Sequence, residues 1–451
     1  MKQEPRQLGL DVSHGVSAGG MPFSAETEPS AQASPKPIWS DLMAKVCEHQ
    51  NLQDACKRVK RNKGSPGVDG MTVDELDTYL REHGPDLAAA LLAGRYIPQP
   101  IRAVTIAKPD GGERILGIPT VVDRLVQQAV LQVLTPLLDP GFSEDSYGFR
   151  PGRSAHAAVR RAQAHVQSGK QWVVDVDLAK FFDRVNHDIL MGRLAKRIGD
   201  KALLRLIRRY LEAGMFARGL VTDRHEGTPQ GGPLSPLLAN VLLDEVDKEL
   251  ERRGHSFVRY ADDLNVYVGS KRAGERVMAH LRAHYAKLKL AVNESKSAVA
   301  PAPERKFLGF TLEVTGGQVQ LAVSKAALAT FQHRVRQMTR RCIGQSMTEV
   351  IRTLSDYLRG WYGYFGITQE QYRMQNLDSW IRRRLRSLQL NQWRHGRVIY
   401  QRLRAFGIND RQSRGVAQYA GRWAWLTAHH ANSVLPNRYF TKLGLYFLFK
   451  K

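Results

Sequence analysis

Apolar residues recur at helix or strand spacing along most of the chain after about residue 40. Helical periodicity extends from Trp39–Asp41 to about Gly94 and is interrupted once, by the turn-rich stretch 63–70. Positions 101–118 favour two short strands around an Asp-Gly-Gly turn, because glycine supplies the positive φ that a tight hairpin needs. Positions 123–138 return to helical spacing.

The middle of the chain mixes strands with helices. Strand-like alternation predicts β structure over residues 172–176, a hairpin with acids at its tip over 257–268, and a short β element near 307–314. Helices are predicted over residues 189–211, 234–251 and 273–288 and over most of the remainder. The order predicts an α+β fold followed by a helical region, without an internal repeat.

The net charge of +24 on 451 residues changes this picture, because it favours a polyanionic partner such as nucleic acid. From Ser324 to Lys451 there are 23 Lys and Arg against five Asp and Glu, so +18 of the charge lies there. Most of these cations are Arg, interleaved with Trp, a combination that suits phosphate and base contacts. A basic protein without a nucleic-acid partner is the alternative reading.

The cysteines and the apolar stretches narrow the class of protein further. Cys47, Cys56 and Cys342 form no C-x-x-C pair, so neither a disulfide framework nor a zinc site is indicated, and a reducing cytoplasm is the expected location. No stretch is long and apolar enough to span a membrane. Residues 1–40 are rich in Ser, Gly, Pro and Ala and are expected to form a disordered leader.

The most informative motif is Tyr260-Ala261-Asp262-Asp263, which places two adjacent carboxylates at a hairpin turn. Two neighbouring acids repel each other, and burial adds a desolvation cost. A pair of divalent cations, about 4 Å apart in polymerases, would remove that cost. An Asp-Asp turn taken alone is usually a solvated loop, so this reading needs a third carboxylate.

The strand at 172–176 supplies that carboxylate. Alternation puts Trp172, Val174 and Val176 on one face and Asp175 and Asp177 on the other. Periodicity alone does not choose between the two acids.

These motifs together resemble the palm of reverse transcriptases, and within that superfamily the proteins encoded by group II introns. Residues 177–183 are similar to the family's first catalytic block and residues 260–263 to its second. The resemblance implies that three carboxylates are both catalytic and metal-binding: Asp177, Asp262 and Asp263. It leaves Asp175 as a supporting acid. It also implies that Phe182 lies beneath the sugar 2′ position and excludes ribonucleotides by steric contact.

Two further blocks resemble the nucleotide-binding parts of the family. Residues 228–236 are similar to its Pro-Gln-Gly turn, which implies that Gln230 contacts the incoming nucleotide. Residues 108–119 resemble its fingers hairpin, which implies that Lys108 and Arg114 bind the triphosphate. From the residues alone, a loop before a helix and a surface hairpin explain these segments equally well.

Three other blocks separate group II proteins from viral and retron-like enzymes. Residues 63–72 resemble the N-terminal extension, residues 146–154 the block that touches template, and residues 357–365 the maturase-specific thumb. The resemblance covers about residues 41–395 and implies a right-hand polymerase fold. The domains expected are a leader (1–40), an N-terminal extension with fingers and palm (41–320), a helical thumb or maturase domain (321–395) and a basic, DNA-binding-like segment (396–451).

The function implied is that of an RNA-directed DNA polymerase using two Mg²⁺ ions, which also binds its intron RNA to assist splicing and retrohoming. The implied partners are the intron RNA, an RNA template with a DNA primer, dNTPs and target DNA, within a bacterial cytoplasmic ribonucleoprotein. The nuclease of many relatives is expected to be missing, since Cys342 is the only cysteine after Cys56. Alternatives are an RNA-dependent RNA polymerase, a splicing-only maturase and a domesticated reverse transcriptase in DNA repair or defence.

Overall fold

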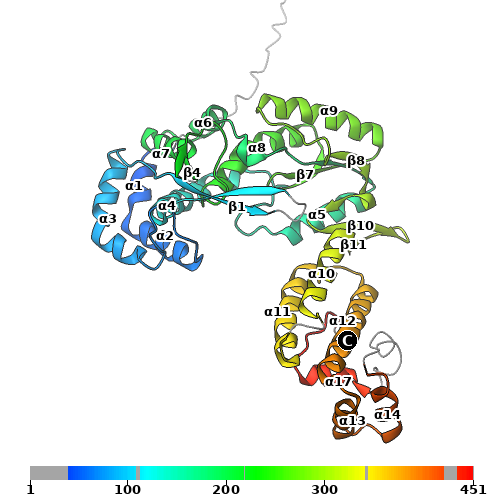
Figure 1. Cartoon of the computed structure of the whole chain (residues 1–451). Coiled ribbons are helices and arrows are strands. Elements are labelled where there is room, and N and C mark those ends of the chain that lie inside the picture. The colour runs from blue at the N-terminus through cyan, green and yellow to red at the C-terminus, as the bar shows by residue number, and fades with distance from the viewer. Residues whose placement is uncertain (1–38, 108–111, 218, 341–343, 421–433, 450–451) are drawn as a thin grey trace, which may run out of the picture. The chain divides into compact units, whose positions relative to one another are not determined.

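The computed structural model describes residues 39–107, 112–217, 219–340, 344–420 and 434–449 (Figure 1). All but the end of the expected leader, together with Lys108 and Cys342, lies outside these described residues.

The described elements are a mixture of helices and strands up to residue 323 and are helical beyond it. The strands are β1 (Ile101–Ala107), β2 (Glu113–Ile118), β3 (Trp172–Val176), β4 (Met215–Ala217), β5 (Leu220–Thr222), β6 (Ser256–Tyr260), β7 (Asp263–Val268), β8 (Ala298–Pro301), β9 (Lys306–Phe307), β10 (Phe310–Thr315) and β11 (Gln318–Val323). The helices up to residue 323 are α1 (Leu42–Cys47), α2 (His49–Arg61), α3 (Leu76–Leu92), α4 (Val121–Leu138), α5 (Ala155–Gln167), α6 (His187–Ala195), α7 (Lys201–Glu212), α8 (Ser235–Arg252) and α9 (Lys271–Lys287). Three short 3₁₀ turns are η1 (Asp139–Gly141), η2 (Phe181–Asp183) and η3 (Ala302–Glu304). The later helices are α10 (Lys325–Met338), α11 (Met347–Phe365), α12 (Gln371–Trp393), α13 (Gly396–Ala405), α14 (Asp410–Ala417) and α17 (Asn437–Lys442).

The sheet that carries the acidic motifs has the strand order β6-β7-β3-β8 and is antiparallel throughout. The alternation predicted for residues 172–176 is confirmed. Val174 and Val176 enter the main core with helices α4 and α8, whereas Val173 enters a second core with Val159 of α5. Because both faces of β3 are covered, only residues at the ends of the strand could contact a substrate or a metal ion.

Several features of this region differ from the sequence prediction, which did not include helix α5 or strands β8 and β11. Strands β4 and β5 were not predicted, and they extend a second sheet with the order β2-β1-β4-β5. At three residues each they are too short to produce a recognisable alternation. The single helix predicted over 189–211 is two helices, α6 and α7. The Asp200 side chain begins α7 by accepting hydrogen bonds from Ala202 N and Leu203 N.

The helices after residue 323 share a core of their own, in which Phe331, Leu354, Leu385 and Phe440 are fully buried. Ser346 and Glu349 form a reciprocal capping box at the start of α11. The last described residues return to α12, where the buried carboxylate of Asp378 accepts hydrogen bonds from Leu448 N and Phe449 N at 3.0 and 2.9 Å. None of the helices among the described residues is long and apolar enough to cross a membrane.

Replacement of Asp378 by Ala is expected to lower the free energy of unfolding by about 1–3 kcal/mol, because two buried N–H groups lose their acceptor. Chemical denaturation followed by circular dichroism measures this change. Asp356→Ala is the matched control, since Asp356 is exposed on α11 and pairs only with Arg359 one turn away. Equal denaturation midpoints for the two variants would contradict the structural role of Asp378.

Candidate active site

The acidic turn is the connection between β6 and β7. Tyr260 pairs with Asp263, so Ala261 and Asp262 alone form the loop. Ala261 has φ of 58°, the positive value that two-residue hairpin loops require at their first position. Gly148 lies against this turn so closely that a Cβ there would be 2.2 Å from Ala261 N. The turn is therefore fixed by its own geometry and by the segment beside it.

The strand register brings Asp177 to the same end of the sheet. Val176 pairs with Leu264, so the next residue of β3's chain, Asp177, lies beside Asp263. Asp177 is also tied to the loop after α9, because Asn293 N donates to Asp177 O at 2.8 Å and Asp177 N donates to Ser297 Oγ at 3.0 Å. The three predicted carboxylates thus belong to adjacent strand ends, as the sequence prediction supposed.

Asp175 and Asp177 have different surroundings. The Asp175 side chain is 12% exposed and accepts from Arg305 Nε and Nη2 at 2.8 and 2.5 Å. The Asp177 side chain is 38% exposed, accepts from Asn293 Nδ2 at 3.1 Å and has Lys296 Nζ at 3.8 Å. Asp175 therefore forms a buried ion pair, whereas Asp177 is more exposed to solvent. This difference favours Asp177 as the metal-binding acid that the resemblance implies.

Negative charge is concentrated at this end of the sheet. Burial, together with the charges of Asp175, Asp262 and Asp177, raises the pKa of Asp263 to about 7, and Lys306 opposes the shift only weakly. Burial also raises the pKa of Asp175, against the effect of Arg305. A divalent cation would offset this repulsion.

Carboxylate oxygens are the ligands that Mg²⁺ prefers, and it keeps several waters or substrate phosphates in its shell. Within the described ranges no three His, Cys, Asp or Glu side chains form a ready set of metal ligands. The carboxylate oxygens of Asp177, Asp262 and Asp263 are donors of the kind that suits Mg²⁺.

The residues predicted to contact the nucleotide fall around one loop. Thr228 N donates to Phe182 O at 2.7 Å, and Gly117 N on β2 donates to Gln230 O at 2.9 Å. Gly227, with φ of 87°, passes so near η2 that a Cβ would lie 3.0 Å from Phe182 O. The loop therefore joins Phe182, Gln230 and strand β2, a connection that the sequence did not reveal.

The two predicted triphosphate-binding cations are placed less fully. Arg114 lies on β2, where it pairs with Ile106 of β1. Lys108 falls in the connection between these strands, outside the described residues. Their role as triphosphate ligands stays a prediction.

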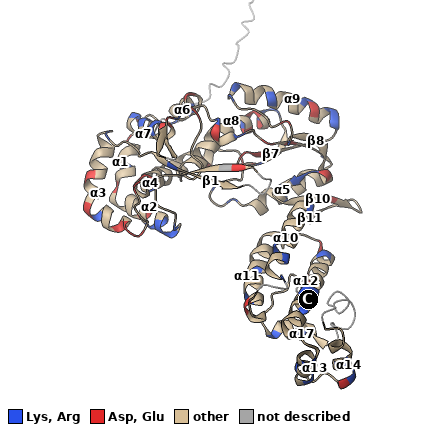
Figure 2. Ribbon diagram, viewed as in Figure 1, with Lys and Arg blue, Asp and Glu red and all other residues tan. Residues whose placement is uncertain are grey.

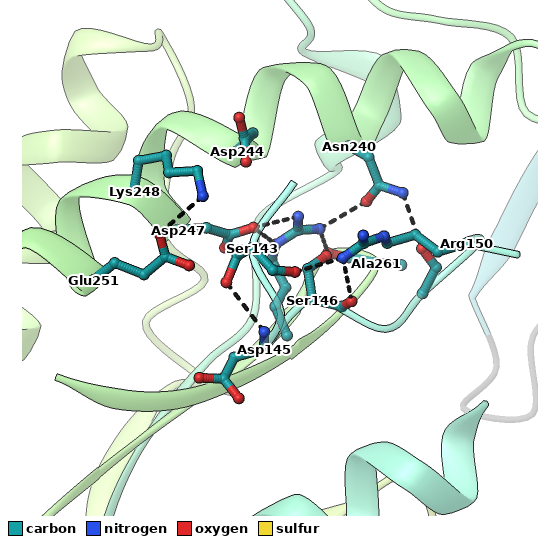
Figure 3. A network of polar contacts seen from close by, with 12 residues as sticks. Ser143, Asp145, Ser146, Arg150, Asn240, Asp244, Asp247, Lys248, Glu251 and Ala261 are labelled. Carbon is teal, nitrogen blue, oxygen red and sulfur yellow. Dashed lines mark hydrogen bonds and ion pairs between the residues drawn. The ribbon is translucent and has the colours of Figure 1, made fainter. Parts of the chain in front are cut away.

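A buried polar network supports the acidic turn from behind (Figure 3). Arg259 and Asp247 are wholly buried, and Arg259 Nε and Nη2 donate to the Asp247 carboxylate at 2.8 and 2.6 Å. Arg259 Nη1 donates to Ala261 O and to Asn240 Oδ1, both at 2.9 Å. Asn240 Nδ2 donates to Gly148 O at 2.9 Å. The Arg259 guanidinium therefore connects helix α8 with the acidic turn, and Asn240 extends the network to Gly148.

Sequence reasoning missed this network and the Asn293–Ser297 loop. Asn240 and Asp247 are seven residues apart, which places them on one face of α8, and polar residues on an otherwise apolar helical face are a usable signal. Asn, Ser and Lys between a helix and a strand indicate a turn but do not reveal what the turn contacts.

Two family models match consecutive parts of the chain. The reverse transcriptase (RNA-dependent DNA polymerase) family matches residues 106–312, and the group II intron maturase-specific domain matches residues 328–407. The chain belongs to the group II intron-encoded reverse transcriptase and maturase family. The recognition made from the catalytic blocks is thus confirmed.

Individual proteins are similar to parts of this chain. Protein YkfC of Escherichia coli (strain K12) is 38% identical over 218 residues, which are 47% of this chain and 57% of YkfC. Group II intron-encoded protein LtrA of Lactococcus lactis subsp. cremoris is 38% identical over 195 residues, 43% of this chain and 32% of LtrA. A solved partial Cas6-RT-Cas1--Cas2 complex aligns with a TM-score of 0.35 and 26% identity over 54% of this chain and 42% of that one. The matches thus span less than two thirds of these curated relatives.

Replacement of Arg259 by Lys in this reverse transcriptase-family chain is expected to lower the free energy of unfolding by about 1–3 kcal/mol. A lysine keeps the charge but cannot satisfy Asp247, Asn240 and Ala261 O together, so buried acceptors lose their donors. Urea denaturation measures the change. Arg252→Lys is the control, because Arg252 is exposed on α8 and pairs with Glu249 one turn away. If both variants unfold at the wild-type midpoint, the turn is held by something other than Arg259.

Proposed function

We propose that the chain is an RNA-directed DNA polymerase in which Asp177, Asp262 and Asp263 hold catalytic Mg²⁺. The observation that carries the proposal is the meeting of these carboxylates at one end of a sheet, inside the part of the chain that matches the reverse transcriptase family. The substrates would be a DNA primer on an RNA template and dNTPs.

The chain's own residues would orient the reactants. The carboxylates of Asp177 and Asp262 would hold the ions, with Asp263 assisting from its more buried position. Bound Mg²⁺ supplies activation of the primer 3′-OH and neutralisation of the leaving pyrophosphate. Gln230 would contact the nucleotide, and Phe182, attached through Thr228 to the same loop, would limit space at the sugar 2′ position. Lys108 and Arg114 would bind the triphosphate.

Replacement of Asp262 by Asn is expected to abolish DNA synthesis while leaving RNA affinity nearly unchanged, because the amide keeps the shape of the side chain but loses the charge that binds a cation. Primer extension on an RNA template with dNTPs or rNTPs measures the first quantity, and filter binding measures the second. DNA product from wild type with dNTPs, and none from the variant, is the expected result.

The control for this experiment is Asp86→Asn, an exposed acid on α3. Equal loss of synthesis and of RNA binding in Asp262→Asn would mean that the acid maintains the fold rather than the chemistry. Extension by wild type with rNTPs as readily as with dNTPs would favour an RNA polymerase instead.

A second activity, maturase function, has its own observation. The maturase-specific match at 328–407 covers α10 to α13, where Lys and Arg outnumber Asp and Glu (Figure 2). Arg334 and Arg336 are exposed on α10 and Arg340 is exposed just after it, and Arg336 also lies over the ring of Trp380 at 5.5 Å. These helices would hold intron RNA in its splicing-competent fold, and the resulting ribonucleoprotein would carry the intron into target DNA.

The affinity for intron RNA is expected to fall steeply with added salt, because each phosphate contact releases condensed counterions. Binding titrations at several KCl concentrations give the slope of log affinity against log salt, and six or more contacts would reduce affinity about 1,000-fold or more between 50 and 200 mM. Asp262→Asn should show the wild-type slope. A nearly flat response would argue against phosphate recognition by the basic helices.

A further inference from the structure

A hollow of about 480 Å³ lies at the end of the β6–β7 hairpin remote from the acidic turn. Its floor includes Ser256 and Tyr267, which pair with each other at that end of the hairpin, and one wall is the first half of α9. Tyr260 lies four residue steps along β6 from Ser256, which corresponds to about 13 Å. A ligand here would not compete directly with one at the carboxylates.

The side chains around this hollow are basic. Five cationic or imidazole groups line it, and none of its lining residues is acidic; the five are Lys170, Arg253, His255, Arg276 and His280. We refer to this set as the rear pocket. They come from four separate places: the turn after α5, the connection into β6, and two positions of α9 one turn apart.

Neighbouring acids neutralise only part of this charge. Glu249 of α8 serves both Arg253, at 2.5 Å, and His280, at 3.3 Å, and it also pairs with Arg252. Lys170 donates to the Ser256 hydroxyl, and within the described ranges neither it nor Arg276 has a carboxylate partner. Cations gathered without counter-charge repel one another, and an anion would relieve that repulsion.

The pKa of His255 is lowered by burial and by the positive charge around it. Burial lowers its pKa, and the charges of Arg253 and His280 lower it further, against a smaller effect of Glu249. A neutral imidazole still has one N–H to donate, so His255 can contribute a hydrogen bond to an anion without adding charge.

We propose that the rear pocket binds the phosphodiester backbone of structured RNA, and specifically of the chain's own intron RNA. The inference rests on the proposed maturase function, since that function supplies an RNA large enough to reach a surface away from the carboxylates. Clustered cations and hydrogen-bond donors recognise phosphate oxygens independently of sequence.

A free nucleotide suits the pocket less well than a backbone does. The volume lies within the about 300–1,000 Å³ that small ligands occupy. However, the one Phe, Tyr or Trp ring among the lining residues is Tyr267, which is 2% exposed and cannot offer a face to a base. Recognition therefore has to come from phosphate contacts without a stacked base, and a backbone that crosses the pocket supplies such contacts.

The test compares two charge reversals on α9. Arg276→Glu removes a cation from the rear pocket, and Lys287→Glu removes an exposed cation from the same helix 11 residues away, about 16 Å along its axis. Arg276→Glu is expected to lower intron-RNA affinity roughly tenfold at 150 mM KCl and to reduce the salt slope by about one or two. Lys287→Glu is expected to stay within about twofold of wild type, and neither variant should change primer extension on a short template.

The outcomes distinguish failure of the rear pocket as an RNA site from failure of the proposed maturase function. Equal affinities and slopes for the two variants would overturn the rear pocket as an RNA site. Displacement of bound RNA by 1 mM GTP in wild type but not in Arg276→Glu would make it a nucleotide site and also overturn the proposal. If wild type does not prefer its intron RNA over an unrelated RNA of equal length, the maturase proposal fails. The comparison of Arg276→Glu with Lys287→Glu on the unrelated RNA still decides whether the pocket binds backbone.

Discussion

The buried pairing of Arg259 with Asp247 is the constraint on which the candidate active site depends. Both side chains are removed from water, so the desolvation cost is offset only if every donor of the guanidinium finds an acceptor. The acceptors come from α8 and from the acidic turn itself, through Asp247, Asn240 and Ala261 O. Any displacement of the turn would leave buried polar groups unsatisfied. The free-energy cost of leaving these buried groups without partners therefore fixes the position of the turn and of its carboxylates.

The front of the same turn has the opposite electrostatic character. Asp262 and Asp263 share the sheet end with Asp177, and burial, reinforced by the negative charges of Asp175, Asp262 and Asp177, raises the pKa of Asp263 to about 7. If only its own hairpin held the turn, the turn could move and increase the distance between the carboxylates, which would relieve this repulsion. Gly148 and Arg259 prevent that movement from behind, so the charge is retained in a small volume where a cation can neutralise it.

The parts of this arrangement that could be predicted from the sequence are those encoded by local pattern. The alternation at 172–176 and the apolar runs flanking Asp262 locate β3, β6 and β7 correctly, and the catalytic blocks identify the family. The α6–α7 break was missed because the predicted helix is apolar at helical spacing on both sides of Asp200. The contacts of Asn293 and Arg259 were missed for a different reason. Each joins segments far apart in the chain, and periodicity carries no information about such pairs.

The choice between Asp175 and Asp177 shows where the missing information lies. Asp175 lies in β3 and Asp177 directly follows it, and the local sequence pattern does not distinguish the two acids. Arg305, 130 residues later, pairs with Asp175, and Asn293, 116 residues later, holds Asp177 in a more exposed setting. Asp175 pairs with a guanidinium in a buried setting, whereas Asp177 accepts from an amide and stays more exposed. Two aspartates two positions apart therefore have different surroundings, and partners supplied by tertiary structure make the difference.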